Sequence, residues 1–341
     1  MLRINWYQRL FWSMLLLVFL LFLSVIVCTA LGSASVAPAA AFKVLFQWVF
    51  GTEDVQTTAA VIVTRIRLPR IVLAFFVGAA LSAAGAALQG LLRNPLAEPY
   101  TLGVASGAAV GTALTLVIFP GDTFWGILGM PLVAFLGALL TGIFVYRLAL
   151  VEGHLAVETL ILAGVIMNSF MSAVLSFLLT IAGENMHQII YWMMGNLNLR
   201  GSEYLLYTSP YLVVGVIVLC LFGKELNILT FGEETAGQLG VSVERIKKLL
   251  LFVATLLTGV AVALAGTIGF IGLIVPHLVR LLLGPDHRVL IPVSAVGGGV
   301  FLIWADTLAR TLLAPVELPV GVVTAFLGVP FFVYLLRTRK R

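Results

Sequence analysis

Long apolar runs with few charges recur along almost the whole chain. A helix needs about 20 residues to cross a hydrocarbon core of about 30 Å, and in lipid only helices and closed barrels satisfy every backbone hydrogen bond. Ten runs approach that length, near residues 10 to 31, 71 to 92, 100 to 118, 125 to 146, 159 to 182, 204 to 222, 249 to 268, 270 to 284, 289 to 309 and 319 to 337. The pattern predicts an all-α, polytopic integral membrane protein with about ten transmembrane helices.

The composition favours one membrane domain. Of the 341 residues, 61% are hydrophobic and 10% are charged, and the mean hydropathy is +1.12, which is typical of membrane proteins. The charges occur singly or in short clusters between the apolar runs, so no polar stretch is long enough to fold as a soluble domain. We therefore expect a single transmembrane domain over residues 1–341.

The first apolar run has a second interpretation. It follows Arg3 and Arg9 and precedes a small-residue stretch at 33 to 41, as a cleaved signal peptide does. The run from 10 to 31 is longer than the usual apolar region of such peptides, which has about 7 to 15 residues. A retained span is therefore the favoured interpretation.

Neither the cysteines nor the basic excess points to another class of protein. Cys28 and Cys220 both lie inside apolar runs, so no disulfide is predicted. The isoelectric point of about 9.4 comes with no Lys/Arg run except the cluster from Arg337 to Arg341. Basic residues beside helix ends are typical of cytoplasmic loops, so we expect no nucleic-acid partner.

The distribution of basic residues predicts the orientation in the membrane. A cytoplasmic N-terminus followed by ten spans leaves six Lys and Arg residues outside, namely Lys43, Arg65, Arg67, Arg70, Arg200 and Arg310, and the other fourteen of the twenty inside. Cytoplasmic loops carry the excess of positive charge. Both termini are therefore expected in the cytoplasm.

A weak internal repeat is present at an offset of 181 residues. Gly78, Gly85 and Pro95 have the same spacing as Gly259, Gly266 and Pro276. Five spans separate the two copies, so they have opposite orientations, as in the inverted repeats of many transporters. The repeat halves are expected at about 65–185 and 246–341. The glycines and proline of 249 to 279 also divide that stretch into a full span and a shorter one.

Motifs for chemistry on this chain are missing from the sequence. It has no Gly-rich phosphate loop of the G-x-x-x-x-G-K-[ST] kind, no H-E-x-x-H and no G-x-S-x-G, and no two of its four histidines have ligand spacing on one helix face. We expect no enzyme activity, no cofactor and no metal site. Any process driven by ATP would need a separate ATPase.

Several longer motifs together resemble one family. In chain order they are Arg67-Leu-Pro-Arg70, Gly85 with Gln89, Asn94-Pro-Leu-Ala-Glu-Pro99, Leu102-Gly-Val, Tyr191-Trp-Met-Met-Gly195, Gly232-Glu-Glu-Thr-Ala236, Leu239-Gly-Val241, Gly269-Phe-Ile-Gly272, Pro276-His277, Asp286-His-Arg288 and Glu317-Leu-Pro-Val-Gly321. The chain from about residue 65 resembles the FecCD-type permeases of binding-protein-dependent ABC importers for ferric siderophores, haem and cobalamin. The sequences of these motifs are most similar to those of cobalamin permeases.

The resemblance implies a pathway with a cytoplasmic gate. The turn from Asn94 to Pro99 is a rigid hairpin on physical grounds, because its prolines fix φ and remove donors. In the family this turn lies at the cytoplasmic end of the pathway, so Asn94 and Leu96 are also candidate gate residues. The run 159 to 182 carries small and polar residues at helical spacing that suit either close packing or, by resemblance, the pathway: Gly164, Asn168, Ser169, Ser172 and Ser176.

A short cytoplasmic segment at about 229–241 is the candidate contact with an ATPase. A solvated loop would have a similar composition, but the resemblance implies paired short helices that seat in a cleft of the ATPase and transmit its closure. The residues of this candidate coupling segment are Gly232, Glu233, Glu234, Ala236, Leu239 and Gly240.

Three outer arginines complete the set of candidate site residues. Arg67, Arg70 and Arg310 are expected to be exposed at the outer side, against the positive-inside trend, and could simply anchor the protein in the membrane. By resemblance they meet carboxylates on a binding protein, a task that suits the planar guanidinium. Asp306 and Arg310, four residues apart, are also expected to form an ion pair.

The sequence therefore predicts a multi-pass permease of the cell membrane, surrounded by lipid, that imports an iron–siderophore, haem or cobalamin-type chelate. By resemblance it acts as a homodimer with two cytoplasmic ATP-binding subunits and an extracytoplasmic substrate-binding protein. The alternative is a secondary transporter driven by an ion gradient, which the inverted repeat alone would permit. That alternative needs a coupling carboxylate at mid-membrane, and Asp306 and Glu158 are expected near span ends.

Overall fold

The computed structural model describes residues 5–32, 34, 36–51, 57–119, 124–197 and 201–338. Each of the ten predicted runs corresponds to one helix, so the all-α fold is confirmed. These helices are α1 (Trp6–Ala30), α4 (Leu68–Leu91), α5 (Val104–Ile118), α6 (Phe124–Leu148), α7 (Val157–Ile181), α9 (Gly201–Leu221), α12 (Val243–Ala265), α13 (Ile271–Leu283), α14 (His287–Thr311) and α15 (Val320–Thr338).

Seven of these helices are long and apolar enough to cross a membrane, among the residues described. The other three, α5, α13 and α15, contain apolar helical stretches of only 10–17 residues. A helix rises 1.5 Å per residue, so the 13 residues of α13 extend only about 20 Å. The expected division of 249 to 279 into a full span and a shorter one is thus observed.

The remaining elements are short and lie between these helices. They are α2 (Pro38–Val49), α3 (Thr58–Val61), the π-helical turn η1 (Ile62–Arg67), the 3₁₀ turns η2 (Pro99–Leu102) and η3 (Gly183–Asn185), α8 (Met186–Met193), α10 (Gly223–Leu229), α11 (Glu233–Gln238) and the antiparallel strands β1 (Leu150–Val151) and β2 (His154–Leu155). Glu152 and Gly153 join the strands and both have positive φ, as a two-residue hairpin turn requires.

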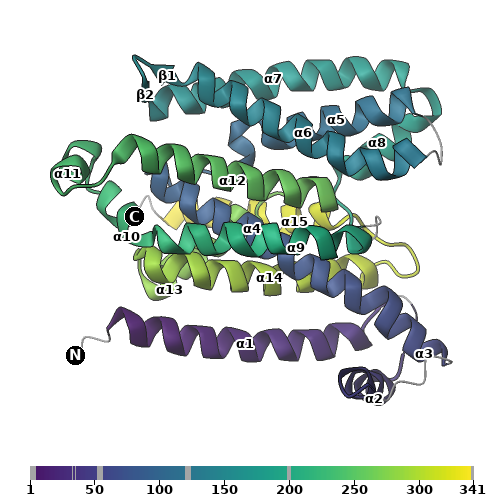
Figure 1. Ribbon diagram of the computed structural model, residues 1–341. Helices are drawn as coiled ribbons and strands as arrows, with labels where there is room; N and C mark the ends of the chain where they lie inside the picture. Colours follow the sequence, from purple (N-terminus) through teal and green to yellow (C-terminus); the bar gives the residue numbers. More distant parts are fainter. Residues whose placement is uncertain are drawn as a thin grey trace.

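The helices stack in layers around α4 (Figure 1). In this view α5, α6, α7 and α8 lie on one side, α12, α4 and α9 run through the middle with α15 behind them, and α13 and α14 follow on the other side, with α1 outermost. In the most apolar window of each helix, 83% of the residues are buried for the span that contains α4, against 6% for α1. The helix α4 is therefore the centre of the fold, and α1 is a peripheral helix.

Small residues allow α4 to touch its neighbours closely. A Cβ placed on Gly85 would lie 1.9 Å from the carbonyl oxygen of Gly272 at the start of α13, and a Cβ on Gly298 of α14 would lie 2.5 Å from the carbonyl oxygen of Gly78. Backbone-to-backbone contact of this kind is the usual basis of helix association in lipid, where burial of apolar side chains gives little driving force.

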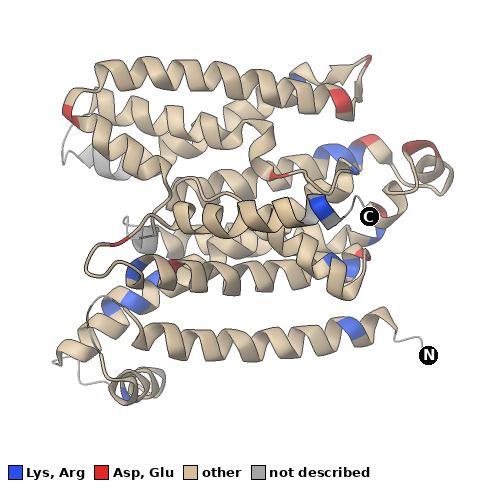
Figure 2. Cartoon of the chain, turned by 180° about the vertical axis from the view of Figure 1, so that it is seen from behind, with Lys and Arg blue, Asp and Glu red and all other residues tan. Residues whose placement is uncertain are grey.

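Charged side chains gather toward the two ends of the helix bundle, and the middle is almost free of them (Figure 2). In Figure 1, α1 begins and α15 ends at the end of the bundle that carries α10, α11 and the β1–β2 hairpin. The first and the last span therefore have their terminal ends at the same face of the bundle, as an even number of crossings requires. The orientation of this face toward the cytoplasm stays a prediction.

The predicted repeat also stays a prediction. In both halves a long helix is followed by a short one and then by a long one, α4–α5–α6 and α12–α13–α14. The offset of 181 residues does not align equivalent positions, because Pro95 lies in a turn whereas Pro276 lies inside α13.

Two adjacent glycines of α14 give a direct test of the packing. Gly298→Ala should destabilise the fold by about 1 to 3 kcal/mol, the usual cost of overpacking, because the new Cβ would meet Ser82 Cβ at 2.4 Å. Gly297→Ala meets only Val275 Cγ1 at 3.4 Å, which is an ordinary contact. The thermal unfolding midpoint in detergent should fall for Gly298→Ala only, and equal midpoints for the two variants would contradict the close contact of α4 and α14.

Candidate functional site

The predicted pathway residues of α7 lie on two sides of that helix. Gly164 is buried, and a Cβ on it would lie 2.1 Å from the Thr101 carbonyl oxygen of η2. Asn168 also faces inward and accepts a hydrogen bond of 2.7 Å from the Ser106 hydroxyl on α5. Gly164 and Asn168 therefore have a packing role in this chain, whatever else they do.

The three serines of the same set form an exposed face. Ser169, Ser172 and Ser176 are exposed, and the hydroxyls of Ser169 and Ser176 donate to carbonyl oxygens one turn earlier on α7, those of Val165 and Ser172. Such internal bonds satisfy a hydroxyl on a surface that water does not always reach. The helix α7 is the outermost helix of its side of the bundle (Figure 1), so this face is open to lipid, to solvent or to another chain.

The predicted gate turn is ordered by its own side chain. The Asn94 carboxamide oxygen accepts from the Leu96 amide at 2.9 Å, and the Asn94 carbonyl accepts from the Ala97 amide at 3.1 Å. This is the local turn expected of asparagine before proline. Leu96 is 48% exposed, so its side chain is available for contact. The gate role of both residues stays a prediction.

Glu98 of this turn and Tyr100 just after it bind the backbone between α12 and α13, a role of these two residues that sequence reasoning missed. The Glu98 carboxylate accepts from the Phe270 amide at 2.6 Å. The Tyr100 hydroxyl accepts from the Ile268 amide and donates to the Ile268 carbonyl, both at 2.9 Å. A non-helical segment at membrane depth needs such partners for its backbone groups. The signal in the sequence was a lone carboxylate within an otherwise uncharged stretch.

The candidate coupling segment is largely exposed around one buried residue. Gly232 and Gly240 flank α11 with φ of 116° and 82°, which glycine adopts without strain. Ala236 is fully buried, whereas Leu239 is 64% exposed. Glu233 and Glu234 begin α11, and only Glu233 is partly covered. The short helix therefore presents apolar and acidic side chains outward, as a contact surface for another protein would.

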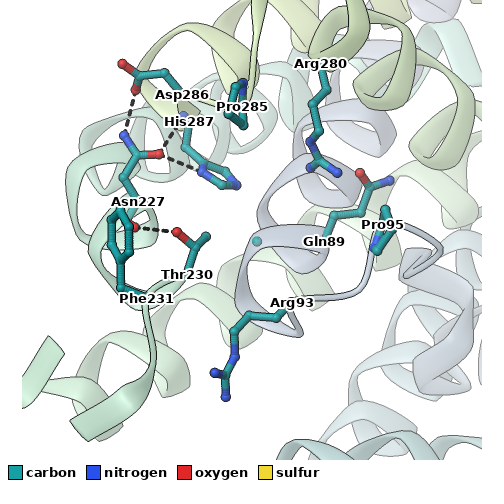
Figure 3. Close-up of a pocket in the computed structure, with 11 residues that line it drawn as sticks. Gln89, Arg93, Pro95, Asn227, Thr230, Phe231, Arg280, Pro285, Asp286 and His287 are labelled. Carbon is teal, nitrogen blue, oxygen red and sulfur yellow. Dashed lines mark hydrogen bonds between the residues drawn. The ribbon is translucent and has the colours of Figure 1, made fainter. Parts of the chain in front are cut away.

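A pocket of about 600 Å³ lies beside this segment. It is formed by α10, the ends of α4 and α13, and the turn before α14 (Figure 3). Asn227 of α10 holds one wall together: its carboxamide oxygen accepts from the His287 amide at 2.8 Å and lies 2.8 Å from His287 Nδ1, and its amide donates to Asp286 at 2.6 Å. These bonds join α10 to the beginning of α14.

Asp286 keeps its negative charge in this wall. Partial burial raises the pKa of its carboxyl, but hydrogen bonds from the Arg288 side chain, from Asn227 and from the Arg288 amide outweigh it and lower the pKa to about 2. The motif Asp286-His-Arg288 thus caps α14 and binds α10. Sequence analysis listed the motif without assigning it a role, because Asn227 lies 59 residues away.

The three arginines are buried, so the expectation that they are exposed is wrong. Arg67, Arg70 and Arg310 are 4%, 7% and 3% exposed. Arg70 forms ion pairs of 2.8 Å with both Asp306 and Glu317. The expected pair between Asp306 and Arg310 is present at 3.4 Å. A buried charge needs such partners, and the carboxylates that meet these arginines in the single chain are its own.

Arg67 and Arg310 also tie the peripheral helix α1 to the core. Their guanidinium groups donate to carbonyl oxygens at the end of α1, with distances of 2.7 to 2.9 Å for Thr29, Ala30, Leu31 and Cys28. Carbonyls at a helix C-terminus lack partners within the helix and carry partial negative charge. The arginines therefore act as a C-terminal cap for α1, while docking of a binding protein to them stays a prediction.

Comparison with known proteins shows which family the chain belongs to. The model of the FecCD transport family matches residues 16–338. The chain belongs to the FecCD transport family. It is therefore a membrane-spanning transport permease and not itself an enzyme, and the family assigns it to ABC transport rather than to ion-driven secondary transport.

Individual relatives cover most of the chain. An ABC transporter permease of Bacillus subtilis, described as uncharacterised, is 45% identical over 93% of this chain and 91% of its own. The cobalamin import permease of Halobacterium salinarum is 49% identical over 84% and 76%, and the haemin transport permease of Yersinia pestis is 42% identical over 96% and 97%. A solved inward-facing transporter of metal-chelate type matches with a TM-score of 0.80, 30% identity and coverage of 98% and 99%.

The ion pairs of Arg70 lead to a prediction on stability. Arg70→Gln should destabilise the permease by about 3 to 5 kcal/mol, because Asp306, 1% exposed, loses its 2.8 Å partner and becomes a poorly compensated buried charge. Arg65→Gln is the matched control, since Arg65 precedes it in the same segment and is exposed. Thermal unfolding in detergent should separate the two variants clearly. If Arg70→Gln has the same unfolding midpoint as the wild type and only its affinity for the binding protein falls, the role of Arg70 is docking rather than packing.

Proposed function

We propose that this chain forms the membrane pathway of an ABC importer for a metal-chelate compound of the cobalamin, haem or iron–siderophore type. The observation that carries the proposal is the family match over residues 16–338, together with relatives whose names state cobalamin and haemin transport. The chelate itself stays open between these classes, because the relatives differ in cargo at similar identity.

In this proposal the chain works as a homodimer with two cytoplasmic ATPase subunits. The exposed α10–α11 region would supply the contact with the ATPase, since it presents Phe231 and Leu239, 76% and 64% exposed, beside Glu234. Apolar side chains that a single chain leaves exposed at its polar end favour contact with another protein. An extracytoplasmic binding protein would deliver the chelate at the opposite end of the bundle.

The translocation pathway is proposed between two copies of the chain, along the serine face of α7. Ser169, Ser172 and Ser176 would line it, and the hydroxyls of Ser169 and Ser176 are already bound to the helix backbone. A weakly polar surface of this kind offers few strong contacts, which suits a bulky chelate that must leave as easily as it enters. Asn94 and Leu96 would lie at the cytoplasmic exit as gate residues.

The function is tested by reconstitution. The chain would be co-expressed with the ATPase and binding protein encoded beside it and purified through a tag on this chain. The complex should then take up cyanocobalamin, haemin or ferric citrate into proteoliposomes only with ATP. Absence of a co-purifying ATPase, with uptake only under an ion gradient, would sink the proposal.

The proposed dimer face is tested by cross-linking. In a background with Cys28→Ala and Cys220→Ala, Ser172→Cys should give a covalent dimer with bifunctional maleimides, because the two α7 helices would face each other across the pathway. Leu16→Cys is the control, since this α1 residue is 58% exposed but lies on the far side of the bundle from α7 (Figure 1). A dimer band of equal strength for both variants, or for neither, would argue against pairing through α7.

A further inference from the structure

One basic residue in the coupling region is almost completely buried. Lys247, in the second turn of α12, is 2% exposed, whereas its neighbours Arg245 and Lys248 are exposed. A lysine is rarely buried unless its ammonium is paired. Its position near the polar end of the bundle would have allowed the side chain to reach water, so the burial reflects specific partners.

The ammonium group of Lys247 has three acceptors. Its Nζ lies 2.8 Å from Glu233 Oε2, 2.7 Å from Glu244 Oε1 and 2.6 Å from the carbonyl oxygen of Leu155. A lysine ammonium has three N–H donors, so each donor has one partner. The group is therefore fully satisfied where it lies, and displacing any one acceptor leaves a buried donor unpaired.

The acceptors come from three different parts of the chain. Glu233 is the first residue of α11, Glu244 lies in the first turn of α12, and Leu155 is in β2. The other carboxylate oxygen of Glu244 accepts from the Leu155 amide at 2.9 Å. Both backbone polar groups of Leu155 are thus bound to the Lys247–Glu244 pair, which fixes this strand residue to α12.

Leu155 lies close to the start of α7. The helix begins at Val157, two residues later, and the Leu160 amide is bound to the Ala156 carbonyl at 2.9 Å. A shift of Leu155 therefore moves the first turn of α7. At the other end of the contact, a shift of α11 moves Glu233. Lys247 lies between the segment proposed to touch the ATPase and the helix proposed to line the pathway.

We infer that Lys247 is a positioning residue that transmits movement of α11 to α7 through Glu233 and Leu155, a role that rests on the function proposed above. The transmission works because the buried ammonium holds its three acceptors together: when α11 moves, separation from Glu233 would leave a buried charge with one carboxylate fewer, so the cluster moves as a unit. The turn of the β1–β2 hairpin lies in open space, since a Cβ at Gly153 would have no atom within 4 Å.

The test compares nucleotide-dependent movement in two segments of the assembled transporter. Hydrogen exchange would be measured on the permease–ATPase complex with and without ATP and vanadate. In the wild type, nucleotide should change the exchange of both 233–238 and 155–165. In Lys247→Met, the change at 233–238 should persist and the change at 155–165 should fall by about fivefold or more, the lower range of typical coupling between sites. A merely structural role would alter exchange equally in both nucleotide states.

Lys248→Met is the matched control, because it makes the same substitution on the next, exposed residue, whose ammonium lies 6.0 Å from the Tyr146 ring centre. It should behave as the wild type. A nucleotide response of 155–165 in Lys247→Met as large as in the wild type would overturn the inference. If Lys247→Met is not recovered from membranes, Glu233→Gln decides on the same criterion, since it removes one charge from a side chain that is 39% exposed.

A second readout separates this inference from the proposed function. In proteoliposomes that import cyanocobalamin, haemin or ferric citrate, Lys247→Met should raise the ATP hydrolysed per molecule imported by about fivefold or more, while the amount of co-purified ATPase stays the same. An unchanged ratio with intact uptake refutes the inference alone. If the wild type imports none of the three compounds, the proposed cargo class fails, and the exchange experiment still decides the role of Lys247.

Discussion

The structure depends on one constraint, that every backbone group and charge placed away from water must find its partner inside the protein. The constraint is most severe between α12 and α13, where the helix stops at Ala265 and restarts at Ile271. Glu98 and Tyr100 supply partners for the Phe270 amide and for both backbone groups of Ile268. Because Glu98 lies in the turn after α4 and Tyr100 just follows that turn, the break fixes where the chain between α4 and α5 runs. The candidate gate turn is therefore held by the interactions that make the broken helix possible.

The same constraint explains the charged cluster at the other end of the bundle. Asp306 is 1% exposed and lies between Arg70 and Arg310, and Glu317 adds a second carboxylate to Arg70. Two of the three arginines also satisfy carbonyl groups at the end of α1. This cluster connects α1, α4 and the segment from α14 to the loop before α15, three parts of the chain that are distant from one another in sequence. If a binding protein docks to these arginines, its carboxylates must compete with those already present, so docking and rearrangement of this end would be linked.

Periodicity and composition predicted the helices well because a membrane span is specified locally. All ten apolar runs correspond to helices, and the glycines of 249 to 279 located the break. The short helices α2 and α8 were missed, since 12 and 8 residues at the ends of spans give no comparable signal. Side-chain partners were predicted only where they are close in sequence, as for Asp306 and Arg310. The shorter pair of Asp306 is with Arg70, 236 positions away, and a single sequence does not reveal such a separation. The exposure of the arginines was predicted wrongly for the same reason.

Lys247 is held by contacts that its position in the sequence does not reveal. In the sequence it is one of several charged residues that follow the candidate coupling segment, whose composition a solvated loop would share. The fold instead places it where α11, α12 and β2 converge, with all three donors bound. In the proposed importer the permease would receive its movement from a separate ATPase, through the short surface helix α11. One strong contact of α11 is the salt bridge between Glu233 and the buried ammonium of Lys247. The strand β2 shares this ammonium and leads into α7. The contacts that stabilise this region are therefore the contacts through which the proposed movement of α11 would pass to α7.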